Sequence, residues 1–140
     1  MMTNNANKKN INKIKDLIEE KESFKEVTIK EFALPDGWAN KIAEELGNKM
    51  KTAQLRKVFN SIKLMEQKIK DENKQNKFDD PNLYMLLPHL AYAKGRKLIP
   101  NEFYELMKVI ISNKIKTIGD FERFCEFMTA IVAYHKQYSK

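Results

Sequence analysis

Apolar residues recur three or four positions apart along most of this 140-residue chain, a spacing that places them on one face of an α-helix. The longest such stripe begins after Thr52 and consists of Leu55, Val58, Phe59, Ile62, Met65 and Ile69. The chain has only 4 Gly and 4 Pro, too few for the many tight turns of a β-sandwich or barrel. The predicted fold is therefore all-α, a single compact bundle of five or six short helices.

Local signals predict where several helices begin and end. Thr52 is the expected N-cap of the helix that carries this stripe, and Asp80 followed by Pro81 is typical of an N-cap and first helical position. Pro88 is expected to kink that next helix, and Gly95 to end it. Further helices are expected over residues 11–21 and 38–46, from Pro100, and from a capping box at Thr117 and Asp120 to about Tyr138.

Two parts of the chain lack a clear helical period. Residues 1–10 are polar and are expected to be disordered, and residues 24–34 are expected to form a connector. We accordingly divide the chain into residues 1–22, a polar tail with a short helix, and residues 23–140, the helical bundle domain.

The last predicted helix is apolar around most of its circumference. Its apolar residues are Phe121, Phe124, Cys125, Phe127, Met128, Ile131, Val132, Tyr134 and Tyr138. Such a helix is buried, either at the centre of its own domain or against a partner. The sequence leaves both alternatives open, and we expect the excess apolar surface to mediate association through Tyr134 and Tyr138.

The positive charge is concentrated in one segment. The net charge is +7, and residues 47–77 alone carry nine basic and three acidic residues. Cations confined to one element are expected of a protein that binds a polyanion. The alternative is a solvated lysine-rich surface, since the chain has 23 Lys and 3 Arg.

Two basic clusters are candidate nucleic-acid contacts. The first is a stripe at helical spacing after Thr52, formed by Arg56, Asn60, Lys63, Gln67, Lys70 and Lys74. Its cations would attract phosphates and its amides would donate hydrogen bonds to phosphate or 2′-OH groups. The second cluster is Lys94, Arg96 and Lys97 around Gly95, at a helix end where the backbone carbonyls favour cations.

No set of residues suggests catalysis, a cofactor or a metal. Cys125 lies within the apolar last helix and is expected to be a buried, inert thiol. His135 could contact phosphate or a partner, but it has no companion as a general base, and His89 is expected at the surface. Asp79 and Asp80 are explained by helix capping. With no apolar segment long enough for a signal peptide or a membrane span, we expect a cytoplasmic protein with no membrane contact.

Three segments, in order, resemble the small subunit of the type III-A CRISPR (Csm) effector complex. KTAQLRKVFN at residues 51–60 is similar to the family's Thr/Ser-x-Gln-hydrophobic-Arg-Lys pattern, and LPHLAYAKGR at residues 87–96 to its Pro-x-Leu-Ala-Tyr-Ala-x-x-Arg pattern. FCEFMTAIVAYHK at residues 124–136 is similar to the family's closing Ala-hydrophobic-Val-Ala-Tyr-His-Lys pattern. The resemblance covers about residues 50–138, and the first fifty residues match less well.

The resemblance implies a non-catalytic, all-helical subunit that stacks in several copies beside the backbone subunits and the large subunit. It implies contact with the guide RNA–target RNA duplex, whose A-form backbone is recognised by charge and shape. Arg56 and Arg96 occupy the family's basic positions and are the first candidates for RNA contact. Lys51, Lys57 and Lys63 are second candidates, and Lys94 and Lys97 belong to the second cluster.

Two other functions remain open at this point. One is a helical protein–protein adaptor that uses its apolar last helix and binds no RNA. The other is the small subunit of the related Cmr-type complex, which is also helical, although the closing Ala-Tyr-His-Lys run favours the Csm type.

Overall fold

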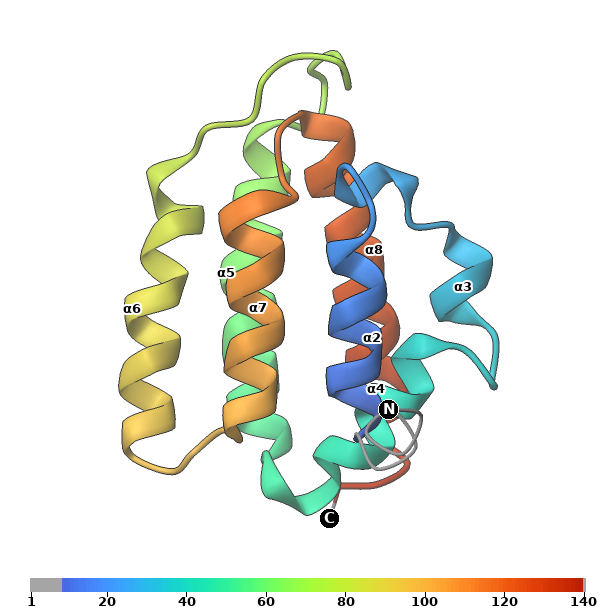
Figure 1. Ribbon diagram of the computed structural model, residues 1–140. Coiled ribbons are helices and arrows are strands. Elements are labelled where there is room, and N and C mark those ends of the chain that lie inside the picture. Colours follow the sequence, from blue (N-terminus) through green and yellow to red (C-terminus); the bar gives the residue numbers. More distant parts are fainter. Residues whose placement is uncertain (1–8, 140) are drawn as a thin grey trace.

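The computed structural model describes residues 9–139, which form an all-α bundle (Figure 1). The expected polar tail therefore lies, up to residue 8, outside the described residues. The α-helices are α2 (Asn10–Glu19), α3 (Ile29–Ala33), α4 (Trp38–Leu46), α5 (Thr52–Lys68), α6 (Pro81–Gly95), α7 (Asn101–Asn113) and α8 (Ile118–His135). Two 3₁₀ turns, η1 (Phe24–Glu26) and η2 (Gly47–Lys49), complete the order. Within residues 9–139 the extended pairing is limited to one isolated bridge between Lys77 and Thr117, so the predicted fold class is confirmed.

The bundle is built around α8. Helices α3, α4 and α5 and the turn η1 all pack against it, while α2 packs on α7 and α4, and α6 packs on α7 and α5. In Figure 1, α6 forms one side of the molecule and α3 the opposite side, with the other helices between them. Ile11, Ile14 and Ile18 place the inner face of α2 in the same core as the rest of the bundle.

Other elements of the same chain cover the apolar surface of α8. This corrects the expectation that α8 has apolar surface left for a partner. Its large apolar residues are at most partly exposed, because α3, α4, α5 and η1 pack around it. The Tyr134 hydroxyl donates a hydrogen bond to the Ala33 carbonyl (2.6 Å), and the Tyr138 hydroxyl donates one to Asn40 Oδ1 (2.8 Å). These two tyrosines hold α8 to α3 and α4, and the helix ends at His135 rather than near Tyr138.

Residues 24–34 are more ordered than the expected connector. Phe24 in η1 and Phe32 in α3 are buried, and their rings lie 5.3 and 5.4 Å from the ring of Phe127. A capping box between Thr28 and Glu31 starts α3. The sequence prediction failed here because the segment is held by contacts with α8, not by its own periodicity.

The turn between α3 and α4 requires a glycine. A Cβ at Gly37 would lie 2.7 Å from the Glu31 carbonyl oxygen, closer than nonbonded atoms approach. The absence of a side chain therefore lets the two helices meet at a short turn.

The predicted starts of α6 and α8 and the predicted end of α6 are confirmed. Asp80 accepts a hydrogen bond from the Asn82 N–H, Gly95 is the last residue of α6, and Thr117 with Asp120 forms the capping box of α8. The start of helix α5 differs from the prediction. Lys51 is its N-cap, whereas Thr52 is its first helical residue, and the Thr52 hydroxyl forms a hydrogen bond with the Ser139 hydroxyl.

Asp120 also joins two segments that lie far apart in the sequence. Its fully buried carboxylate accepts hydrogen bonds from the backbone N–H groups of Lys25 (2.8 Å), Lys116 (3.0 Å) and Thr117 (2.9 Å). Burial alone would raise the pKa of this carboxyl, but these donors, with the Ser23 hydroxyl, hold its pKa below the ordinary value. The charged form is therefore the one that stabilises the fold.

We predict that Asp120→Ala lowers the free energy of unfolding by about 3 kcal/mol, because it leaves several buried N–H groups without an acceptor. Since the folded-state pKa is below the unfolded value of about 3.9, the stabilisation is complete above that value and is lost as the pH falls through the folded-state pKa. Urea unfolding between neutral pH and about pH 3 measures both effects. Asp71→Asn, at an exposed position, is the control and should change stability by no more than about 0.5 kcal/mol.

Leu83 and Met85 provide a second test of the fold, because they lie on opposite faces of α6. Leu83 is fully buried, whereas the Met85 side chain is half exposed. Leu83→Ala should cost about 2–5 kcal/mol and Met85→Ala less than about 1 kcal/mol, as measured by chemical unfolding. Equal costs for the two variants would contradict the observed orientation of α6.

Candidate nucleic-acid interface

Helices α5 and α6 run side by side and leave a groove between them. Its two ends are two hollows that share Ser61, Leu86 and His89. Residues near the start of α5 and the end of α6 line one hollow, and residues near the end of α5 and the start of α6 line the other, so the two helices are antiparallel. We call these the cationic hollow and the apolar hollow.

The cationic hollow has a volume of about 450 Å³. Its polar lining consists of Gln54, Lys57, Ser61, His89, Tyr92 and Arg96, and its apolar lining of Val58, Leu86, Leu90, Ala93, Leu98 and Ile99. Lys57 comes from α5 and Arg96 follows the last residue of α6, so two elements bring two cations to one place. The lining contains no carboxylate, which leaves the positive charge of the hollow uncompensated by its own walls.

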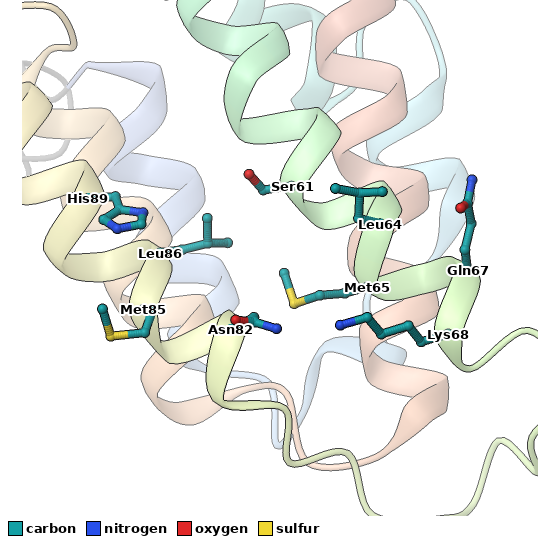
Figure 2. Close-up of a pocket in the computed structure, with 9 residues that line it drawn as sticks. All are labelled: Ser61, Leu64, Met65, Gln67, Lys68, Asn82, Met85, Leu86 and His89. Atoms are coloured by element: carbon teal, nitrogen blue, oxygen red, sulfur yellow. The ribbon is translucent and has the colours of Figure 1, made fainter.

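The apolar hollow lies toward the other end of the groove and has a volume of about 570 Å³ (Figure 2). Figure 2 shows side chains from both helices around it: Ser61, Leu64, Met65, Gln67 and Lys68 of α5, and Asn82, Met85, Leu86 and His89 of α6. Lys68 is the one charged residue of this lining. Leu64 and Met85 are exposed at 63% and 50%.

The end of α6 presents its cations on a tight turn. The Leu98 N–H donates to the Ala93 carbonyl (2.9 Å) and the Lys97 N–H to the Lys94 carbonyl (2.9 Å). Lys97 has a φ of 62°, a left-handed conformation that is uncommon for a residue with a side chain. The turn keeps Arg96 and Lys97 exposed beside the C-terminal carbonyls of α6, whose partial negative charge favours cations.

Tyr92 is the exposed aromatic residue of the cationic hollow, and sequence analysis did not single it out. Its side chain is 67% exposed, and the guanidinium carbon of Arg96 lies 5.8 Å from the centre of its ring. The spacing of four residues on one helix could have indicated this pair. Gln54 and His89 were also missed as lining residues, although His89 is exposed as expected.

The predicted RNA-contact residues fall into three groups. Lys57 and Arg96 share the cationic hollow, and Lys51, Arg56 and Lys97 are exposed without lining it. Lys63 and Lys94 already have partners: Lys63 Nζ lies 2.5 Å from Glu66 Oε1, and Lys94 Nζ lies 4.3 Å from the centre of the Tyr104 ring. The hydrogen bond that the Lys63 ammonium donates to Glu66 raises the pKa of Lys63, so the lysine stays charged but is already paired.

The basic stripe is shorter than expected. Because α5 ends at Lys68, Lys70 and Lys74 lie beyond the helix and do not continue its face. Lys74 instead lies beside α8, with its ammonium 3.6 Å from Glu122 and its carbonyl accepting the Gly119 N–H. The polar residues that follow the buried C-cap Ile69 lack the apolar positions that would hold another helical turn against the core.

Two residues considered for chemistry are buried. Cys125 is buried as expected, and burial raises the pKa of its thiol far above the ordinary value. His135 is buried too, which corrects its expected contact with phosphate or a partner: its Nε2–H donates to the Gly47 carbonyl (3.0 Å). Gly47 has a φ of 40°, so the bond closes a turn that favours glycine.

The part of the chain that the structure describes contains neither a cluster of metal ligands nor a membrane-spanning helix. Over residues 9–139, no three His, Cys, Asp or Glu side chains gather as a metal site would require. None of the helices in this range combines the length and apolar character needed to span a bilayer. Asp79 and Asp80 act locally, as an acceptor for the Tyr84 hydroxyl (2.8 Å) and as the N-cap of α6.

Comparison with known proteins tests the resemblance to the Csm small subunit. The family model described as Csm2 Type III-A matches residues 30–140. A relative from Streptococcus thermophilus, described as "CRISPR system Cms protein Csm2", is 30% identical over 90 residues, which cover 62% of this chain and 71% of that protein. No solved structure matches the chain.

The match extends the resemblance toward the N-terminus, since it begins 21 residues before the first of the three motifs. It includes α4 to α8, and thus both helices of the groove and the central helix. The resemblance to the Csm small subunit, rather than to its Cmr-type counterpart, is thereby confirmed. The chain belongs to the Csm2 family of type III-A CRISPR systems.

Proposed function

We propose that this chain is a non-catalytic small subunit of a type III-A effector complex that binds the sugar–phosphate backbone of the guide RNA–target RNA duplex through the cationic hollow and the residues around it. In this role it works in the cytoplasm, stacks with further copies of itself, and lies beside the backbone subunits and the large subunit of the complex. It requires no cofactor.

The observation that carries the proposal is the convergence of Lys57 and Arg96 on a hollow without carboxylates. Lys51, Arg56 and Lys97 add exposed cations on the adjoining parts of α5 and the α6 turn. An arginine can hold one phosphate through two parallel N–H donors, and a nearby lysine adds a point charge. Such contacts depend on backbone geometry and leave the RNA sequence unread.

Sequence-independent contact suits a subunit of an RNA-guided complex. In such complexes base pairing between guide and target supplies the specificity, and the protein recognises the A-form shape and backbone of the duplex. Tyr92 and Gln54 fit the same role, because a phenol and an amide can donate hydrogen bonds to phosphate or 2′-OH groups.

Contacts within the chain favour some of the candidate residues over others. Arg96 and Lys57 come first because they face the same space from two helices. Lys63 and Lys94 come last because Glu66 and the Tyr104 ring already stabilise their charges, and reorienting either ammonium toward a phosphate would break that interaction.

We predict that Arg96→Glu and Lys57→Glu each weaken RNA binding to a similar extent for unrelated sequences. On a single strand each lost phosphate contact should flatten the dependence of log K on log salt by about 0.7. Fluorescence anisotropy at several salt concentrations, using two RNAs of different sequence, measures both quantities. Lys13→Glu makes the same charge change at an exposed position of α2 and is the matched control.

Double variants test whether the two cations act on one phosphate. Lys57→Glu with Arg96→Glu should cost less than the sum of the single changes, whereas Arg56→Glu with Arg96→Glu should be additive. Melting temperatures of the same samples establish that each variant is folded. If folded Arg96→Glu and Lys57→Glu proteins bind RNA with unchanged affinity and salt slope, the RNA proposal is wrong and the adaptor alternative is favoured.

A further inference from the structure

The groove between α5 and α6 is lined by one stripe of side chains from each helix, and its character changes along its length. The residues of each stripe recur three or four positions apart, which places them on one helix face. They are Gln54, Lys57, Ser61, Leu64 and Lys68 from α5, and Asn82, Met85, His89, Tyr92 and Arg96 from α6 and its C-cap. Ser61 and His89 belong to both hollows and join the cationic end of the groove to the apolar end. A ligand that fills both hollows therefore has a negative group and an apolar group close together.

The apolar hollow has the size and the lining of a site for a small aromatic group. Met65 and Leu86 are buried and form its floor, and the exposed side chains of Leu64 and Met85 form its rim. Figure 2 shows Met65 and Leu86 pointing toward one another from the two helices. The volume of about 570 Å³ lies within the range of small-molecule sites. Methionine sulfur makes favourable contacts with aromatic rings, so two methionines suit an aromatic ligand.

Polar groups at one end of the apolar hollow suit the edge of a heterocycle. Figure 2 shows the Asn82 amide and the Lys68 ammonium extending toward one another from the two helices. An amide both donates and accepts hydrogen bonds, and an ammonium donates them. A nucleobase combines an apolar face with an edge of donors and acceptors, and one ribose joins it to a phosphate. A nucleotide therefore matches both ends of the groove.

We propose that the groove binds RNA at an unpaired nucleotide, with a phosphate at Lys57 and Arg96 in the cationic hollow and the base in the apolar hollow. The proposal rests on the RNA binding of the proposed function and names the form of RNA that the whole groove takes. The bases of a duplex are paired and stacked inside it, so only an unpaired nucleotide can turn its base into the hollow. Because the contacts to the base are mainly apolar, they accept any base and leave the sequence unread.

The alternative occupant of the apolar hollow is an apolar side chain of a protein partner, since exposed apolar surface is typical of protein interfaces as well. The charge of the groove favours the nucleotide. Lys57, Lys68 and Arg96 line the two hollows, and neither lining includes a carboxylate. A ligand that carries phosphate next to its apolar group uses this charge, whereas an apolar side chain leaves it unused.

The test compares three RNAs bound to the full chain: a short single strand, the same strand with abasic sites in place of its central nucleotides, and the fully paired duplex. The variant Leu64→Ser/Met85→Ser removes the rim of the apolar hollow. Leu17→Ser/Leu34→Ser is the matched control, because it removes two exposed leucines of α2 and the C-cap of α3, outside the groove. Fluorescence anisotropy measures affinity, and melting temperatures verify that each variant is folded.

We expect loss of the bases to weaken binding of the single strand by about tenfold. Leu64→Ser/Met85→Ser should weaken binding of the intact strand to a similar extent. It should cause no further loss with the abasic strand, because both changes remove the same contact. Affinity for the duplex and its salt dependence should stay unchanged, since Lys57 and Arg96 are retained. The control variant should bind all three RNAs as the unmodified chain does.

Photocross-linking locates the base directly. A single strand that carries 4-thiouridine is irradiated with the unmodified chain, and the attached peptides are identified by mass spectrometry. We expect attachment within residues 61–68 or 82–89, which line the apolar hollow, and loss of this attachment in Leu64→Ser/Met85→Ser.

Four results would overturn the proposal: equal affinity for the intact and abasic strands, an abasic penalty that persists in Leu64→Ser/Met85→Ser, cross-links confined to other parts of the chain, or loss of assembly into the effector complex with RNA affinity unchanged. The last result would identify the hollow as a protein contact. The proposed function fails separately, if the affinity of the folded chain for the duplex is insensitive to Arg96→Glu. Duplex binding that depends on Arg96, without any effect of the bases, refutes only the base site.

Discussion

The packing of three phenylalanines of α8 organises the whole bundle. Phe121, Phe124 and Phe127 meet rings from parts of the chain far from them in sequence: Phe24 of η1, Phe32 of α3 and Phe78 before α6. Each such pair contributes about 0.5–1.5 kcal/mol beyond the burial of apolar area. These contacts fix α8 at the centre of the bundle. Helix α5 packs against α8, and so do α3 and α4. The groove that carries the proposed RNA contacts is thus positioned by a helix that does not line it.

The features that the sequence predicted well are those that depend on neighbouring residues. Asp80 with Pro81 and Thr117 with Asp120 define helix starts through hydrogen bonds within three residues, so the sequence alone locates them. The features that it predicted poorly depend on distant contacts. Residues 24–34 have no period of their own and take their shape from α8. Distant contacts also explain why Tyr134 and Tyr138, which were expected in an interface, instead form hydrogen bonds within the chain.

The candidate site was likewise predictable only where it depends on residues close together in the sequence. Composition located the excess of positive charge, and motif resemblance selected Arg56 and Arg96. Neither could indicate that Lys57, rather than its neighbour Arg56, shares a hollow with Arg96, because that depends on how α5 and α6 pack. The pairing of Lys63 with Glu66, three residues later, was accessible from sequence and lowers the rank of that lysine.

The central position of α8 also affects how the chain folds as it is synthesised. Every other described helix leaves the ribosome before α8, yet α3, α4 and α5 bury their inner faces against it. Lys25 donates to Asp120 across 95 residues of sequence, so the two ends meet only after nearly all of the described chain is made. Contacts of such high sequence separation slow folding, and the unburied faces of the earlier helices are open to aggregation in the meantime. A nascent chain of this protein must therefore remain incompletely folded until α8 is translated.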